Sequence, residues 1–178
     1  MKILKTITLF AIMLILSLTA ASCSKGIDGV PSGMKKLSND FSDFNMYIPE
    51  AWVIVSDDST GYLSAYVSEN DRSNITVTAF ETEGRYDSLA GFWEYYKSDF
   101  EAAFSEMTVE SEDNVTLDGY EARAYTYTAI TMNVRYKYIQ LICIRGETVY
   151  LITYHAVPEL FAGHVEQFWY IIDKFNFK

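Results

Sequence analysis

The hydrophobic and polar positions from residue 44 onward alternate in several short runs. Alternating or β-branched segments occupy residues 44–49, 52–55, 62–67 and 74–80, and the SDDSTG and SENDRS runs between them are typical of turns. Pro49 ends the first run, because proline cannot donate to a sheet ladder. This spacing predicts an antiparallel meander in the first half of the folded region.

The period changes over residues 87–104, where apolar residues recur at steps of three and four. The stripe consists of Leu89, Phe92, Trp93, Tyr96, Phe100 and Ala103. Such spacing places all six on one face of a helix, and Asp87 or Ser88 can cap its N-terminus. We interpret the aromatic stripe as a helix packed on the sheet, because aromatic side chains supply much of the buried area of a core.

Strand patterns resume at residues 114–119 and 120–130 and in two long runs joined at residues 145–147. A second helix is predicted from Pro158, with Phe161, Val165, Phe168 and Ile172 on one face. The final DKFNFK is expected to form a short edge strand or a tail on the sheet. The predicted fold class is therefore α+β, a mostly antiparallel sheet with helices packed on its faces.

The first 23 residues have a different pattern. A basic start precedes an apolar run from Ile7 to Leu18 and four small residues, and Cys23 follows. This is the layout of a secretory signal peptide, with an apolar run too short to span a bilayer comfortably. The site also resembles the lipobox of bacterial lipoproteins, with Ala20 where leucine is usual.

This resemblance implies that residues 1–22 are removed and that Cys23 carries diacylglycerol and further acyl chains such as palmitate. An ordinary secreted protein and an uncleaved anchor helix are the alternatives. Residues 23–39, rich in Gly, Ser and charge, are predicted to be a flexible linker, and residues 40–178 a single domain. The expected location is the extracytoplasmic face of the cell membrane, held by the lipid.

Charge narrows the choice of partners. The chain has 14 basic and 24 acidic residues, and the predicted signal peptide contains two of the lysines and none of the acids. The mature chain would therefore have a formal charge of about −12. Nucleic acid is not an expected partner, and attachment to the membrane is expected from the lipid and not from a basic patch.

Candidate chemistry is sparse. Apart from Cys23 the chain has only Cys143, which lies in an apolar run and is expected to be buried. His155, Glu159 and His164 are the nearest approach to a metal-binding set, but they cross the predicted strand-to-helix junction. We therefore expect no catalytic residue, metal or cofactor. The acidic run at residues 110–114 is expected to be a solvated turn.

Tyrosine is abundant in the second half of the sheet. Strand alternation places pairs of tyrosines on common faces, and together they form a candidate aromatic binding face for a protein, peptide or glycan: Tyr125, Tyr127, Tyr136, Tyr138, Tyr150 and Tyr154. This requires that the faces coincide and are not fully covered. The alternative is that the rings fill a helix-to-sheet interface.

Three segments resemble the PsbP-like superfamily. They are FNMYIPEAW with Phe44, Pro49 and Trp52, VTLDGYEARAY at residues 115–125, and VYLITYHA at residues 149–156. The resemblance implies an antiparallel sheet with helices on its faces. It transfers no catalytic residue, since members of the superfamily act mainly by binding or by assisting assembly.

These observations predict a membrane-tethered, extracytoplasmic lipoprotein that acts as a non-catalytic binding or accessory module. A small-molecule or metal-binding receptor is the first alternative. A hydrolytic enzyme, which would need His155 or His164 beside a nucleophile or carboxylate, is the second.

Overall fold

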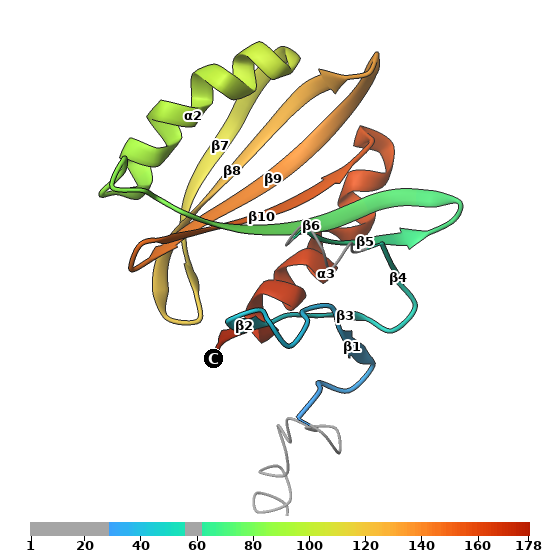
Figure 1. The fold of residues 1–178 in the computed structure, drawn as a ribbon. Coiled ribbons are helices and arrows are strands. Elements are labelled where there is room, and N and C mark those ends of the chain that lie inside the picture. Colours follow the sequence, from blue (N-terminus) through green and yellow to red (C-terminus); the bar gives the residue numbers. More distant parts are fainter. Residues whose placement is uncertain (1–28, 56–61) are drawn as a thin grey trace, which may run out of the picture. The chain divides into compact units, whose positions relative to one another are not determined.

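The computed structural model describes residues 29–55 and 62–178, and the chain divides into the units Met1–Ser32 and Gly33–Lys178 (Figure 1). The second unit is built on a seven-stranded antiparallel sheet with the strand order β4-β5-β6-β10-β9-β8-β7. Its strands are β4 (Val53–Ile54), β5 (Leu63–Ser68), β6 (Asp71–Glu81), β7 (Ser105–Leu117), β8 (Tyr120–Thr131), β9 (Val134–Arg145) and β10 (Thr148–Ala156).

Two short strand pairs lie outside this sheet. The strand β1 (Met34–Lys36) pairs with β3 (Tyr47–Pro49), and β2 (Phe44–Asn45) pairs with β11 (Asn176–Phe177). The predicted run at residues 44–49 thus contributes to two pairings. The closing residues pair with β2 and not with the large sheet.

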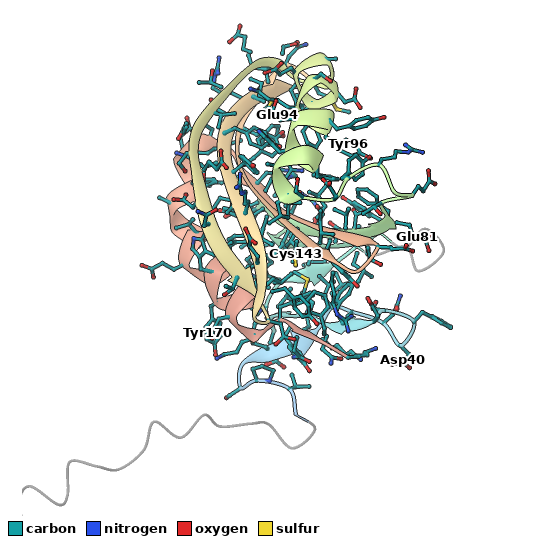
Figure 2. The ribbon with its side chains drawn as sticks, turned by 90° about the vertical axis from the view of Figure 1, so that its left-hand side faces the viewer. Asp40, Glu81, Glu94, Tyr96, Cys143 and Tyr170 are labelled. Atoms are coloured by element: carbon teal, nitrogen blue, oxygen red, sulfur yellow. The ribbon has the colours of Figure 1, made fainter. Side chains whose placement is uncertain are left out.

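Two helices in the described residues pack on opposite faces of the large sheet. The helix α2 (Leu89–Ala103) packs on β7 and β9, and α3 (Pro158–Lys174) packs on β10, β6, β9 and β3. Figure 2 shows the two helices on either side of the sheet. The structure therefore has the expected large antiparallel sheet with a helix on each face, although strands outnumber helices.

The local signals explain where the helices begin. Ser88 caps α2, and its side-chain oxygen accepts a hydrogen bond of 3.1 Å from the backbone N–H of Gly91. Pro158 lies in the first turn of α3, where its missing N–H costs nothing. Both predicted helix starts are confirmed to within two residues.

The predicted linker is too long at its C-terminal end. Met34–Lys36 form β1, and Met34 and Leu37 are buried. Backbone pairing with Tyr47–Pro49 holds this segment despite its weak apolar pattern. Gly33–Asn39 therefore belong to the folded unit. The predicted signal peptide, the lipidation site Cys23 and the first part of the linker lie outside the described residues.

The strand β7 is longer than predicted, and the acidic run at residues 110–114 is part of it and not a turn. Three of its carboxylates pair with bases on β8 and β9. Glu112 lies 2.5 Å from Arg123, Glu110 lies 2.6 Å from Lys137, and Glu106 lies 2.5 Å from Arg135. These ion pairs let a sequence of low β-propensity form an edge strand.

Candidate functional site

The six tyrosines of the predicted binding face lie on two different faces of the sheet. Cross-strand register pairs Tyr127 with Tyr138 and Tyr138 with His155, so these three residues share the face covered by α2. Tyr150 and Tyr154 alternate with His155 along β10 and point to the face covered by α3. A single platform of all six rings therefore does not exist.

Three tyrosines on the α2 side are buried: Tyr125, Tyr127 and Tyr138. The ring of Tyr125 stacks on Trp93 of α2 at 3.8 Å, and Tyr127 stacks on Tyr138 at 4.8 Å. The Tyr127 hydroxyl donates to Oε1 of Gln140 at 3.2 Å, and burial raises the pKa of this tyrosine. These rings fill the interface between helix and sheet, the alternative that the sequence left open.

The tyrosines on the α3 side are buried as well. The Tyr154 hydroxyl donates to the carbonyl of Phe161 at 2.8 Å, and its ring packs on Phe161 and Phe168. Tyr150 donates to the carboxylate of Asp43, and burial, followed by this carboxylate, raises its pKa to about 12. Only Tyr136 among the six is partly exposed, so the predicted binding face is wrong for the other five.

A different surface remains partly exposed. The helix α2 packs on β7 and β9, and the same face of β6 and β10 lies beyond it (Figure 1). On the part of these two strands beyond the cluster around α2, every second side chain is only partly buried, whereas Val149 within that cluster is buried. We call this set the open face; it consists of Asn74, Thr76, Thr78, Leu151, Thr153 and His155.

The opposite face of the same two strands has a different environment. Ile75, Val77 and Ile152 are almost completely buried on the side of α3. One side of each strand is thus sealed by a helix, while the other side combines hydroxyl, amide and imidazole groups. The sequence contains this signal as the alternation of NITVT at residues 74–78, although we did not predict the site from it.

His155 lies at the centre of a row that crosses five strands. The row runs from Tyr127 through Tyr138, His155 and Asn74 to Tyr66, each opposite the next in the register. The His155 ring packs edge-on against Tyr136 at 5.3 Å and lies 5.4 Å from Tyr138. Cross-strand neighbours therefore fix the orientation of the imidazole.

Burial lowers the pKa of His155 to about 4, so the ring is neutral at pH 7. Its Nε2 lies 3.1 Å from Nδ2 of Asn74 and accepts that hydrogen bond. The other end of the amide, Oδ1 of Asn74, is buried and has no hydrogen-bond partner among the described residues. The amide is therefore only half satisfied, which is uncommon for a buried polar group.

The open face contains no residue that is charged at pH 7. The chain as a whole has a formal charge of −10, so an uncharged polar surface is a local exception. Its groups can donate and accept hydrogen bonds without selecting for the charge of a partner. This chemistry suits an uncharged polar partner, such as a glycan or an extended peptide.

A cleft of about 410 Å³ lies elsewhere, between the β7–β8 hairpin and the end of α3. Its lining residues include Trp169, Phe175, Asp118 and Asp173. The volume is within the range of small-ligand pockets. Asp118 also accepts a hydrogen bond of 2.8 Å from the N–H of Phe177, so one of its oxygens has a structural role.

The two histidines lie on opposite sides of the sheet and do not contact each other. His155 lies on the α2 side of the sheet, whereas His164 is on α3 and bonds to Asp71 at 2.8 Å and to Gln167 at 2.9 Å. His155, Glu159 and His164 therefore do not converge on one point. In residues 29–55 and 62–178 no group of three His, Cys, Asp or Glu side chains is arranged to hold a metal.

Cys143 is fully buried on the α3 side of β9. Burial raises the pKa of its thiol to about 11, so the group is protonated and unreactive at neutral pH.

Within the described part of the chain, no helix is both long and apolar enough to cross a bilayer.

Comparisons with solved structures agree with this architecture. The cyanobacterial PsbP of Synechocystis is 11% identical with a TM-score of 0.62, and the match covers 91% of this chain and 99% of that one. LpqN of Mycobacterium tuberculosis, a protein involved in cell envelope biogenesis, is 12% identical with a TM-score of 0.58 and coverages of 80% and 89%. At these identities the likeness shows the fold alone.

A third similar structure is a protein of unknown function from Pseudomonas aeruginosa. It is 17% identical with a TM-score of 0.54, and the match covers 77% of this chain and 91% of that one. No curated protein sequence matches the chain. The profile of the PsbP-like protein family matches residues 29–177, which is most of the chain, and the chain therefore belongs to the PsbP-like family.

Proposed function

We propose that the chain is a lipid-anchored, extracytoplasmic accessory protein whose PsbP-like domain binds an uncharged polar partner on the open face. The observation that carries the proposal is the contrast between the two sides of β6 and β10. One side is sealed by α3, and the other combines Thr, Asn and neutral His side chains that are partly exposed.

The tether is the part of the proposal that rests on sequence. Cys23 follows a signal-peptide pattern and has the position of a lipidated cysteine. Two or more acyl chains can hold a protein on a bilayer where one cannot. Membership of the PsbP-like family and the likeness to an envelope-associated protein support a place in the cell envelope.

The non-catalytic part rests on the surroundings of the histidines. His155 accepts from an amide, and both nitrogens of His164 already have partners. Neither histidine lines the cleft of about 410 Å³. A His–carboxylate pair that joins a helix to a strand, as His164 and Asp71 do, has the geometry of a structural contact, which supports binding over hydrolysis.

Site-directed crosslinking in the native cell tests the binding role. A photoreactive phenylalanine analogue would replace Thr76 or Thr153 on the open face, and Ser111 on the exposed strand β7 as the matched control. We expect one adduct, protein or glycan, from both open-face positions and none from Ser111. The substitution Asn74→Ala should reduce the yield of the adduct from the open-face positions. Equal capture at all three positions would refute a specific site.

The tether has its own test. Cys23→Ser should release the chain from the membrane fraction or leave its signal peptide uncleaved. Unchanged processing and membrane retention would remove the lipid anchor from the proposal without affecting the open face.

A small-molecule receptor is the second candidate, and the cleft beside Trp169 favours it. Trp169, Phe175, Asp118 and Asp173 are among the residues that line the cleft. Thermal-shift measurements against a panel of metabolites and divalent metals would detect such a ligand, and Trp169→Ala should abolish the shift. A shift that survives Trp169→Ala would place the ligand elsewhere.

A further inference from the structure

The turn Asn39–Ser42 presents one aromatic side chain to solvent. Phe41 is 96% exposed, although aromatic residues in folded proteins usually contribute to cores and interfaces. Among the large hydrophobic residues that the structure describes as exposed, only Met132, at 93%, is comparable. Met132 lies at the tip of the β8–β9 hairpin.

Hydrogen bonds hold this turn in place. Oδ1 of Asn39 accepts from the backbone N–H of Phe41 at 3.0 Å, from the N–H of Ser42 at 2.9 Å and from the Ser42 hydroxyl at 3.0 Å. The ammonium of Lys178 donates to the carbonyl of Ser42 at 2.6 Å. The turn is thus preorganised, and the exposure of Phe41 does not result from a loose loop.

The Phe41 ring also stays outside the nearest cleft. That cleft, of about 280 Å³, is lined by Phe41 together with Phe44, Leu63 and Ala79. Since the side chain is 96% exposed, it lies at the rim and does not fill the cavity. The described residues of the domain therefore leave the Phe41 ring in contact with water.

Charge distinguishes this end of the domain from the other. At the turn, Lys36 lies 3.7 Å from Asp40, Arg145 lies 3.5 Å from Asp43, and the Lys178 ammonium bonds to the backbone of Ser42. Residues 86–117, which contain α2 and β7, have eight acidic residues and one lysine, and three of the carboxylates pair with bases of β8 and β9, so this end keeps an excess of four acidic groups. Figure 2 shows Asp40 at one end of the domain and Glu94 of α2 at the other. Anionic lipid headgroups therefore repel the Phe41 end less than they repel the end with α2 and β7.

Few residues separate the turn from the predicted anchor along the chain. Phe41 follows Cys23 by 18 residues, and the folded unit begins at Gly33. A ten-residue tether spans at most about 35 Å when fully extended. A domain held so close has a high effective concentration at the bilayer, so even one aromatic contact can be populated.

We propose that the Asn39–Ser42 turn is a membrane-contact element. The Phe41 side chain inserts into the boundary between headgroups and acyl chains, and the acidic end with α2 and β7 points away from the bilayer. The contacted surface is the membrane in which the lipid on Cys23 is anchored. This inference therefore rests on the tether of the proposed function. The contact would fix which part of the domain faces the bilayer and which part faces away from it.

Photocrosslinking to lipid tests the contact directly. A photoreactive phenylalanine analogue replaces Phe41 in the full chain, and the same analogue at Met132 is the matched control because both side chains are almost fully exposed. Membranes are irradiated, and adducts are identified by mass spectrometry. We expect lipid adducts at position 41 at least tenfold above those at position 132. Equal lipid labelling at both positions, no lipid labelling, or protein adducts in their place would overturn the proposal.

A fluorescent reporter gives a second measurement that does not depend on crosslinking. Asp40→Cys provides an exposed thiol for an environment-sensitive dye, and the buried Cys143 does not compete. In vesicles of phosphatidylcholine and phosphatidylglycerol, the purified lipidated chain should show a blue-shifted dye spectrum. Phe41→Ser should abolish the shift and Phe41→Leu should retain it. A shift that is independent of residue 41 would contradict the proposal.

Fractionation of the wild-type chain distinguishes failure of the tether from failure of the Phe41 contact. A chain outside the membrane fraction overturns both the tether and the contact. A chain that is retained by Cys23 but fails both Phe41 measurements overturns the contact alone.

Discussion

The imidazole of His164 joins helix α3 to strand β6 through Asp71. Its Nε2 lies 2.8 Å from Oδ2 of Asp71, and both side chains are about one-fifth exposed. Trp52, which is buried, packs edge-on against the same ring at 6.3 Å. The pair therefore links elements that are 93 residues apart in the sequence and fixes α3 on its face of the sheet.

We predict that His164→Ala lowers the free energy of unfolding by about 1 to 2 kcal/mol, because it removes a charge-assisted hydrogen bond from a partly buried site. Urea denaturation measures the change. A double-mutant cycle with Asp71→Asn should give a coupling energy of about 1 kcal/mol. Strictly additive effects would show that the two side chains do not depend on each other.

The same pair predicts a loss of stability in acid. Although partial burial would raise the pKa of Asp71, hydrogen bonds from Ser73 and His164 hold it below its usual value. A depressed carboxyl pKa contributes stability above the unfolded-state pKa of about 3.9, and that contribution is lost as pH falls through the lower folded-state pKa. Asp71→Asn should flatten the stability curve below about pH 4. A curve identical to that of the wild type would refute this assignment.

A second pH dependence of stability, at higher pH than that of Asp71, is predicted by the lowered pKa of His155. Its pKa is lowered by burial to about 4, so the unfolded chain, with an ordinary value near 6.5, binds the proton more readily. Stability is therefore complete above about pH 6.5 and declines as pH falls toward 4, by up to about 3 kcal/mol.

The control for that prediction is His155→Gln, which does not titrate and can still accept a hydrogen bond from Asn74. The difference between the two unfolding curves isolates His155, because His164 and the carboxyl groups are common to both proteins. A difference that does not vary between pH 4 and 7 would contradict the predicted pKa.

Tyr127 tests whether the buried tyrosines are structural. Tyr127→Phe removes the only donor that the described residues show for Oε1 of Gln140, which lies at 3.2 Å in a buried position. We expect a loss of about 1 to 2 kcal/mol in unfolding free energy, because a buried acceptor loses its partner. Crosslinking from Thr76 should be unchanged. A selective loss of capture without loss of stability would restore a binding role to this ring.

Cys143 should be inert in the folded protein. Its thiol is buried, and burial raises its pKa to about 11. We expect alkylation by iodoacetamide to be at least about 100-fold slower in the native protein than in urea, because only the thiolate reacts. Mass spectrometry of timed samples measures the rate. Rapid modification in the native state would show that β9 opens locally.

The sequence predicted the fold much better than the site. The period of two in β5, β6 and β8–β10 and the period of three to four in α2 and α3 are visible without a structure, because burial on one side imposes them. The acidic strand β7 was missed because its stability depends on bases in β8 and β9, which local composition cannot reveal.

The error about the tyrosines has a specific cause. Alternation correctly paired Tyr136 with Tyr138 and Tyr150 with Tyr154 within their own strands. The relation between the strands depends on the hairpin register, which places Cys143 opposite Tyr150 and Tyr138 opposite His155. A shift of one residue would have put all four rings on one face. The observed register follows from the two-residue turn Gly146–Glu147, in which Gly146 has a φ of 62°, and the tyrosine prediction did not use this signal.

The pairing of β2 with β11 has a consequence for when the domain can form. Asn45 and Asn176 lie opposite each other and share a hydrogen bond of 2.9 Å across 131 residues of chain. Contacts of such long range form late in folding, because the whole intervening loop must close first. We therefore expect refolding to be faster in a circular permutant in which a short loop joins β2 and β11. In the export that we propose for this chain, the same delay would keep the polypeptide unfolded until β11 has crossed the membrane.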